Sequence, residues 1–230
     1  MSNPDSKRRA LVVGATGLVG GQLLDKLARH PAYESIATLG RNTPAASHNN
    51  LQHFKFGEPD ADQAFDTDVV FCCLGTTIRQ AGSDAAFRAV DVDLVVDIAK
   101  RAQAAGVATF IVVSSLGADA GSRNFYLRIK GEMEQGVVVS GPPRVGIIRP
   151  ALLIGQRDAF RPVEAAWQKA SHLINPFLFG ALRRYRSVDA NDVADAMIGL
   201  DLSTFTGSIF VESDQLSRYS GRSDPQRQSR

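Results

Sequence analysis

Short apolar runs alternate with longer amphipathic segments along most of the 230-residue chain. The runs are rich in valine and isoleucine and do not alternate with polar residues, so they predict strands that are buried on both faces, as in a parallel sheet. The predicted strands span residues 10–13, 36–39, 68–74, 108–113 and 144–149. Residues 18–29 have the spacing of a helix that stops at His30-Pro31.

Two further helical patterns lie between these strands. Residues 86–106 predict one long helix, or two abutting helices, closed by Gly106. Asn124 predicts the N-cap of a helix that runs to about Glu134. The repeated order of strand, helix and strand predicts an α/β fold, a Rossmann-like doubly wound parallel sheet.

The alternation loosens after Pro150. Helical patterns at residues 162–174 and 191–200 are separated by Pro176, glycines and aromatic residues. We therefore predict a single domain over residues 1–230, with a small C-terminal substrate lobe at about 155–187. The polar stretch at about 217–230 is predicted to be a disordered tail.

Composition narrows the class of protein. Hydrophobic residues make up 44% of the chain and charged residues 22%, as in soluble globular proteins. The net charge of +2 is small and the basic residues are scattered, which argues against nucleic acid as a partner. No apolar run is long enough for a secretory leader or a membrane span, so the sequence predicts a cytoplasmic location and no membrane partner.

The cysteines and histidines predict neither a disulfide between Cys72 and Cys73 nor a metal site. Cys72 and Cys73 are neighbours on a predicted strand, so their side chains point to opposite faces and cannot pair with each other. The histidines have no pair with the spacing of metal ligands, so no metal site is predicted. They are His30, His48, His53 and His172.

A glycine-rich loop follows the first predicted strand. Gly14, Gly17 and Gly20 would serve the turn out of the strand, the approach of the backbone to a pyrophosphate, and the packing of helix on strand. The pyrophosphate would lie at the helix N-terminus, where free N–H groups favour negative charge. The loop therefore predicts dinucleotide binding rather than a purely structural turn, and the predicted contacts also include Thr16, Leu18 and Val19.

The end of the second predicted strand bears on the choice of dinucleotide. An NAD site usually has a carboxylate there to hold the ribose hydroxyls. This chain has no acid at that place, and Arg41 follows the strand. Because a guanidinium can bind a 2′-phosphate, we predict NADP(H) as the preferred cofactor. The alternative is that Arg41 is an ordinary solvated arginine and that the cofactor is NAD(H).

A pair with catalytic potential lies farther along the chain. Tyr126 and Lys130 are four residues apart and would share one helix face, where the ammonium would stabilise a phenolate. Such a pair also arises by chance, so it needs support. Ser114 and Ser115 supply it, because they follow a buried strand at its carboxyl end, where doubly wound folds place their sites.

Together these motifs resemble the short-chain dehydrogenase/reductase superfamily, and most closely its extended and atypical branches. The stretches "GATGLVGG", "IIRPALLIG" and "VDANDVADAMI" carry that resemblance. More narrowly, "FCCLGTTIRQAGS", "SSLGAD" and "YLRIKGEME" resemble the branch that includes the Tat-interacting tumour-suppressor oxidoreductase. That branch binds NADPH, which agrees with the interpretation of Arg41.

The resemblance implies roles for individual residues. Tyr126 would be the acid/base, Lys130 its partner and ligand of the nicotinamide ribose, and Ser115, rather than Ser114, the orienting hydroxyl. Many relatives have an asparagine early in the long helix, where this chain has Asp91. The residues expected along the cofactor after the cysteine strand are Leu74, Gly75 and Thr76.

The sequence therefore predicts an NADP(H)-dependent oxidoreductase that acts on a carbonyl/alcohol pair. One alternative is a regulatory or redox-sensing protein that binds NADPH with little turnover. Another is an NAD-dependent sugar-nucleotide epimerase or dehydratase, although the late lobe is short for one. The expected partner is a small-molecule substrate or another protein.

Overall fold

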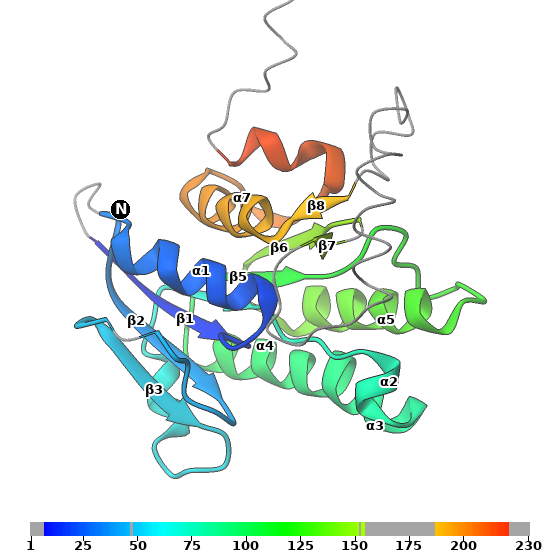
Figure 1. Ribbon diagram of the computed structural model, residues 1–230, viewed down its shortest axis with the longest axis horizontal. Coiled ribbons are helices and arrows are strands. Elements are labelled where there is room, and N and C mark those ends of the chain that lie inside the picture. The colour runs from blue at the N-terminus through cyan, green and yellow to red at the C-terminus, as the bar shows by residue number, and fades with distance from the viewer. Residues whose placement is uncertain (1–6, 47, 152, 155–186, 221–230) are drawn as a thin grey trace, which may run out of the picture.

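The computed structural model describes residues 7–46, 48–151, 153–154 and 187–220. Its strands form a parallel sheet with helices on both faces (Figure 1), which confirms the predicted doubly wound α/β fold. Within the described residues, one sheet has seven strands in the order β3-β2-β1-β4-β5-β6-β9. The strands are β1 (Arg8–Val13), β2 (Tyr33–Gly40), β3 (Leu51–Lys55), β4 (Val69–Cys72), β5 (Thr109–Val113), β6 (Arg144–Arg149) and β9 (Gly207–Glu212).

The strand order reverses direction at the centre of this sheet. From β1 the chain steps to β2 and β3 on one side, and then returns to β4 on the other side of β1. In open parallel sheets, ligands bind outside the carboxyl ends of the strands at such a switch point. The loops after β1 and β4 are therefore the place to look for a site.

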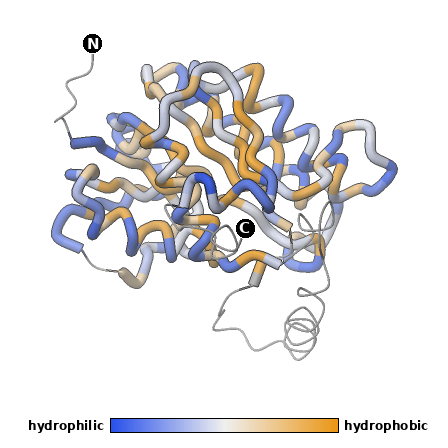
Figure 2. The backbone as a smooth tube through the Cα atoms, turned by 90° about the horizontal axis from the view of Figure 1, so that it is seen from above, coloured by the Kyte–Doolittle hydropathy of each residue, from blue (hydrophilic) through white to orange (hydrophobic). Residues whose placement is uncertain are grey.

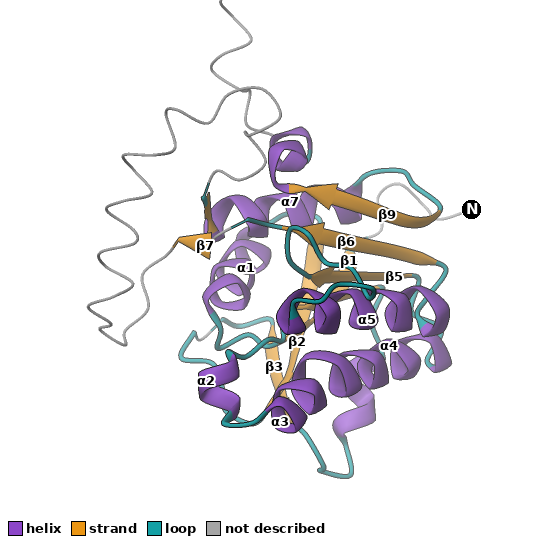
Figure 3. Cartoon of the chain, turned by 90° about the vertical axis from the view of Figure 1, so that its right-hand side faces the viewer, coloured by secondary structure: helices purple, strands orange, loops and turns teal. Residues whose placement is uncertain are grey.

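Two helix layers cover the sheet. Helices α1 (Leu18–Arg29) and α7 (Ala190–Leu202) pack on one face, and the layer on the other face includes α4 (Val95–Ala104) and α5 (Phe125–Ser140) (Figures 1 and 3). Figure 2 shows hydrophobic stretches concentrated in the strands between the layers. The remaining elements are η1 (Ala61–Phe65), α2 (Ile78–Ala81), α3 (Asp84–Arg88), η2 (Ala89–Leu94), η5 (Ser213–Arg218) and the strand pair β7 (Leu153–Ile154) and β8 (Val188–Asp189).

Several helix ends follow from local chemistry. Helix α1 has the predicted bounds, 18–29. Asn124 caps α5, as predicted, because its Oδ1 accepts a hydrogen bond from the N–H of Leu127 at 3.1 Å. Helix α5 ends at Ser140, so the predicted end near Glu134 was too early.

The predicted long helix over 86–106 is a continuous helical run in three parts. Helix α3 leads into η2, a π-helical turn, and η2 leads into α4. A π-helical turn widens the backbone and changes the direction of the side chains that it carries. Gly106, with φ +77°, follows the end of α4.

A buried cluster joins elements at the amino ends of the strands. Asp201, at the end of α7, accepts hydrogen bonds from Arg8 Nη2 at 2.8 Å and from the Tyr33 hydroxyl at 2.7 Å. Burial raises the pKa of the Asp201 carboxyl, although the charge of Arg8 opposes this effect. The cluster ties β1 and β2 to a helix formed much later in the chain.

Some predictions concern segments that the structure does not describe. The helical pattern at 162–174 and nearly all of the predicted substrate lobe lie outside the described residues, as does the part of the predicted tail from 221 onward. Cys72 and Cys73 are free, and they contact the cores on opposite faces of the sheet.

Candidate functional site

The turn after β1 requires its first glycine. Gly14 has φ +84°, a conformation that side chains rarely adopt. A Cβ at Gly14 would also lie 2.7 Å from the carbonyl carbon and oxygen of Cys73, at the end of β4. The loop after β1 therefore packs directly against the loop after β4, at the switch point of the sheet.

The other two glycines of this loop differ in how closely the protein surrounds them. A Cβ at Gly20 would lie only 2.2 Å from the carbonyl oxygen of Gly14, so helix α1 and the loop touch there. A Cβ at Gly17 would lie 3.2 Å from the same oxygen. Gly20 is needed for packing, whereas Gly17 is exposed and a Cβ there would make a tight but less severe contact.

The N-terminus of α1 is available to an anion. Gly17 is its N-cap and is exposed, no side chain caps the helix, and its first turn has no acidic residue. Thr16 is exposed and Leu18 is half-buried beside it. Val19 is 6% exposed and belongs to the core, so only its main chain is available to a ligand in the loop.

We expect Gly17→Val to abolish dinucleotide binding while the protein stays folded, because the added side chain would occupy the space of the pyrophosphate. Gly20→Ala should instead lower the free energy of unfolding by about 1–3 kcal/mol, since its methyl group overlaps a backbone oxygen. Cofactor fluorescence titration and chemical denaturation separate the two effects. Full binding by Gly17→Val would show that this loop is not the dinucleotide site.

Arg41 lies at the carboxyl end of β2. It is exposed and directly follows Gly40, the last residue of that strand. Within the described part of the chain, no hydrogen bond or ion pair engages its side chain. In the adjacent strand β3, Lys55 is in register with Gly40, so the edge next to Arg41 is basic.

The loop after β4 holds the next group of predicted residues. Leu74 and Thr76 are half-buried and Gly75 is exposed. The N–H of Thr76 donates a hydrogen bond to Asp91 Oδ2 at 2.9 Å. A Cβ on Gly75 would lie 3.6 Å from Asp91 Oδ1 and 3.9 Å from Lys130 Nζ, so this loop covers a buried pair of charges.

That pair is an ion pair between η2 and α5. Lys130 Nζ donates to Asp91 Oδ1 at 2.6 Å, and the side chains are 6% and 0% exposed. Tyr126 lies one turn before Lys130 on α5 and is half-buried, with its ring centroid 6.0 Å from that of Phe87 on α3. The structure thus brings Tyr126 and Lys130 to one helix face, beside the loop that contains Gly75.

The two serines after β5 have different environments. Ser114 is buried, and its hydroxyl donates to Glu134 Oε1 at 2.5 Å. Ser115 is half-buried, and its hydroxyl has only a marginal contact of 3.5 Å with the carbonyl oxygen of Leu116. Ser114 is therefore engaged in the interior, and Ser115 is the hydroxyl that a substrate could use.

Glu134 anchors a network behind this site. Its carboxylate accepts from Arg149 Nε at 2.9 Å and from Arg149 Nη2 at 2.6 Å, as well as from Ser114. The hydrogen bonds to Glu134 raise the pKa of the Arg149 guanidinium. The network joins α5 to the ends of β5 and β6 and fixes the backbone next to Ser115.

Sequence reasoning missed the buried partners of Lys130 and Ser114. It noted Asp91 only as a departure from an expected asparagine, and it gave no role to Glu134 or Arg149. A signal was present, because Tyr126, Lys130 and Glu134 recur every four residues and so share one face of α5. If that face is buried, the charges of Lys130 and Glu134 each need a partner from another element.

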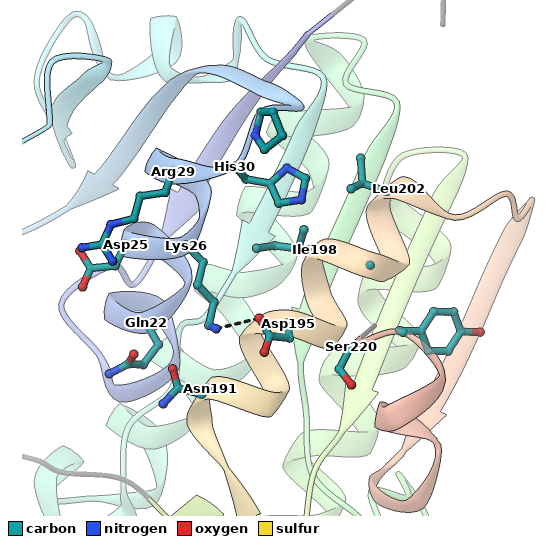
Figure 4. Close-up of a pocket in the computed structure, with 13 residues that line it drawn as sticks. Gln22, Asp25, Lys26, Arg29, His30, Asn191, Asp195, Ile198, Leu202 and Ser220 are labelled. Carbon is teal, nitrogen blue, oxygen red and sulfur yellow. Dashed lines mark ion pairs between the residues drawn. The ribbon is translucent and has the colours of Figure 1, made fainter. Parts of the chain in front are cut away.

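A separate cavity of about 570 Å³ lies away from these residues, between α1, α7 and the end of η5. Figure 4 shows side chains that line it, among which Lys26 and Asp195 form an ion pair at 2.7 Å. His30 and Leu202 also line it, at the C-terminal ends of the two helices. None of the described residues that line it belongs to the loops after β1 and β4.

No helix among the described residues is both long and apolar enough to cross a bilayer. The same part of the chain contains no cluster of three or more histidine, cysteine, aspartate or glutamate side chains suited to a metal ion.

Comparison with known proteins agrees with the fold. Residues 9–120 match the family described as semialdehyde dehydrogenase, NAD binding domain. The solved structure of MoeE5 in complex with UDP-glucose and NAD has a TM-score of 0.65 over 93% of this chain and 82% of that chain, at 14% identity. The fold is therefore a Rossmann-like α/β fold, and its first half is similar to an NAD-binding domain.

Curated relatives define the family more narrowly. Protein FMP52-1, mitochondrial, of Scheffersomyces stipitis is 30% identical over 210 residues, which cover 89% of this chain and 88% of the relative. Protein FMP52, mitochondrial, of Meyerozyma guilliermondii is 35% identical over 198 residues, or 83% and 84%. The chain belongs to the FMP52 family.

These names also correct one prediction. The relatives are named mitochondrial proteins, which contradicts the cytoplasmic location predicted from the sequence. The reasoning failed because it looked for an apolar leader. Mitochondrial transit peptides are amphipathic and rich in arginine, so the lack of an apolar leader says nothing against import into mitochondria.

Proposed function

We propose that this protein is an NADP(H)-dependent oxidoreductase that interconverts a carbonyl and an alcohol through Ser115, Tyr126 and Lys130. The position of Lys130 carries the proposal. Its buried ammonium lies just behind the loop after β4, 3.9 Å from where a Cβ of Gly75 would be. From there it can reach both a cofactor held at the switch point and a tyrosine one helical turn away.

The glycine loop fits a dinucleotide. Exposed Gly17 is the N-cap of α1, and neither a capping side chain nor an acid of the first turn competes for the N–H groups of that turn. This arrangement suits a pyrophosphate. Leu74, Gly75 and Thr76 would border the cofactor on the β4 side. When bound, the nicotinamide supplies or accepts the hydride.

The protein's own residues would handle the proton. In the reductive direction, Tyr126 gives its hydroxyl proton to the substrate oxygen as the carbonyl carbon becomes an alcohol carbon. Ser115 donates a hydrogen bond to that same oxygen and so orients the substrate. Lys130 would hold the ribose, and the phenolate left on Tyr126 regains a proton from water.

The preference for NADP(H) rests on Arg41. It is exposed and directly follows β2, and the carboxyl end of β2 has no acidic residue. A planar guanidinium can bind the 2′-phosphate with two charge-assisted hydrogen bonds. The resemblance to the NADPH-binding branch with the Tat-interacting oxidoreductase supports the same choice.

Arg41→Ala should weaken NADPH binding by about 1.5–3 kcal/mol, the scale of a hydrogen bond to a charged group, and leave NADH binding nearly unchanged. Calorimetry with both cofactors measures this. Arg29→Ala, which removes an exposed arginine at the far end of α1, is the matched control. Equal losses for both cofactors would mean that Arg41 does not read the 2′-phosphate.

Native mass spectrometry of the purified protein, followed by a panel of aldehydes and ketones, tests the function itself. We expect NADP(H) to travel with the protein and at least one carbonyl to be reduced. Co-purified NAD would favour the sugar-nucleotide epimerase. Tight NADPH binding without turnover, together with NADPH-dependent binding to another protein, would favour the regulatory alternative.

A further inference from the structure

Asp91 is held in place from two sides. The π-helical turn η2 places its side chain at 0% exposure between the β4 loop and α5. One carboxylate oxygen accepts from Lys130 Nζ at 2.6 Å and the other from the Thr76 N–H at 2.9 Å. A buried carboxylate with both oxygens engaged is fixed in direction, so it is a permanent part of the surroundings of Lys130.

Direct contact between the Asp91 carboxylate and the Lys130 ammonium weakens the electric field that the ammonium exerts on its neighbours. A lone ammonium near a tyrosine favours the phenolate strongly, because little water screens it. A carboxylate 2.6 Å from that ammonium cancels most of its field at the distance of the neighbouring turn. An asparagine in the place of Asp91 would carry no charge and would leave the field of the lysine intact.

The other groups around the pair do not restore a net charge. Burial raises the pKa of Cys72, on β4 near the pair, to about 12, so this thiol is neutral at physiological pH. Arg88 of α3 is paired with Glu132 on the exposed side of α5, and Arg149 is paired with Glu134. Among the described residues, Arg128 on α5 lies over the Phe125 ring, and the Asp119 N–H in the loop before α5 donates to the carbonyl oxygen of Leu127.

We propose that Asp91 is a positioning residue that neutralises Lys130, so that Tyr126 keeps its proton at neutral pH and serves as a proton donor. Building on the proposed function, this charge balance favours carbonyl reduction over alcohol oxidation. Reduction consumes one hydride from the reduced cofactor and the Tyr126 proton, which form the new C–H and O–H bonds, and water returns the proton to the phenolate.

The ionisation of Tyr126 can be measured without any substrate. The near-ultraviolet absorbance of tyrosinate is titrated in the parent and in Tyr126→Phe, and the difference isolates Tyr126. In Asp91→Asn, compared with Asp91→Asn/Tyr126→Phe, the midpoint should fall by about one pH unit or more.

Asp93→Asn is the matched control. It removes the same charge two residues away in η2, where the Asp93 side chain is 61% exposed, and it should leave the midpoint unchanged. Circular dichroism over the same pH range verifies that the fold persists. An unchanged midpoint in folded Asp91→Asn would overturn the proposal.

A parent midpoint below about 8 would overturn it as well, because the lysine would then act uncompensated; this holds even if Asp91→Asn fails to fold. The titration is separate from the proposed function. A parent that turns over no carbonyl would contradict that function, while the midpoints would still decide whether Asp91 neutralises Lys130.

Discussion

Tyr126→Phe is expected to slow hydride transfer by about 10²–10⁴-fold, the usual contribution of a general acid or base. The change removes one hydroxyl and keeps the ring that packs against Phe87. NADPH binding should therefore survive. Single-turnover reduction of a responsive aldehyde or ketone, run beside a cofactor titration, measures both quantities.

Lys130→Ala provides the contrast, because it should damage turnover and cofactor binding together. Its ammonium would hold the ribose, and its loss also leaves Asp91 buried without a counter-charge. If Tyr126→Phe retains the parent rate, Tyr126 is not the proton donor.

Glu134→Ala should lower the free energy of unfolding by about 3 kcal/mol, at the lower end of the cost of breaking a buried ion pair. Glu134 is 4% exposed, and its removal leaves both Ser114 and Arg149 without their acceptor. The lower end applies because the Arg149 side chain remains 22% exposed and water can reach it. Urea denaturation measures the change.

Glu132→Ala is the control on the same helix. Glu132 pairs with Arg88 in a more exposed position, and exposed pairs contribute at most about 1 kcal/mol. Equal losses for the two variants would show that the network of Glu134 does not stabilise this edge of the sheet. A larger loss of turnover than of stability in Glu134→Ala would show that the network also positions Ser115.

The central strands could be predicted from sequence because burial on both faces produces unbroken apolar runs. Strand β6 has the predicted bounds, 144–149. Strands β3 and β9 were missed because they are the two edges of the sheet. An edge strand has one neighbour and an exposed side, so polar residues such as Gln52 and His53 interrupt its pattern.

The residues of the candidate site also fall into two groups, those that a local sequence pattern reveals and those that it does not. Glycine spacing and the pairing of Tyr126 with Lys130 are local patterns, and a sequence displays them directly. The partnership of Lys130 with Asp91 joins residues 39 positions apart and depends on a π-helical turn, which has no recognisable spacing. Buried partners across elements become visible only when the fold brings them together.

The buried cluster of Arg8, Tyr33 and Asp201 has a consequence for how the chain folds. Arg8 and Asp201 are 193 positions apart, so β1 and α1 leave the ribosome long before α7 exists. At about 5–20 residues per second, this delay is roughly 10–40 s. Until then, Leu23 and Leu27 of α1 lack the α7 residues with which they share a core. The growing chain therefore exposes an apolar helix face during its own synthesis, and transiently exposed surface of this kind is what chaperones protect from aggregation.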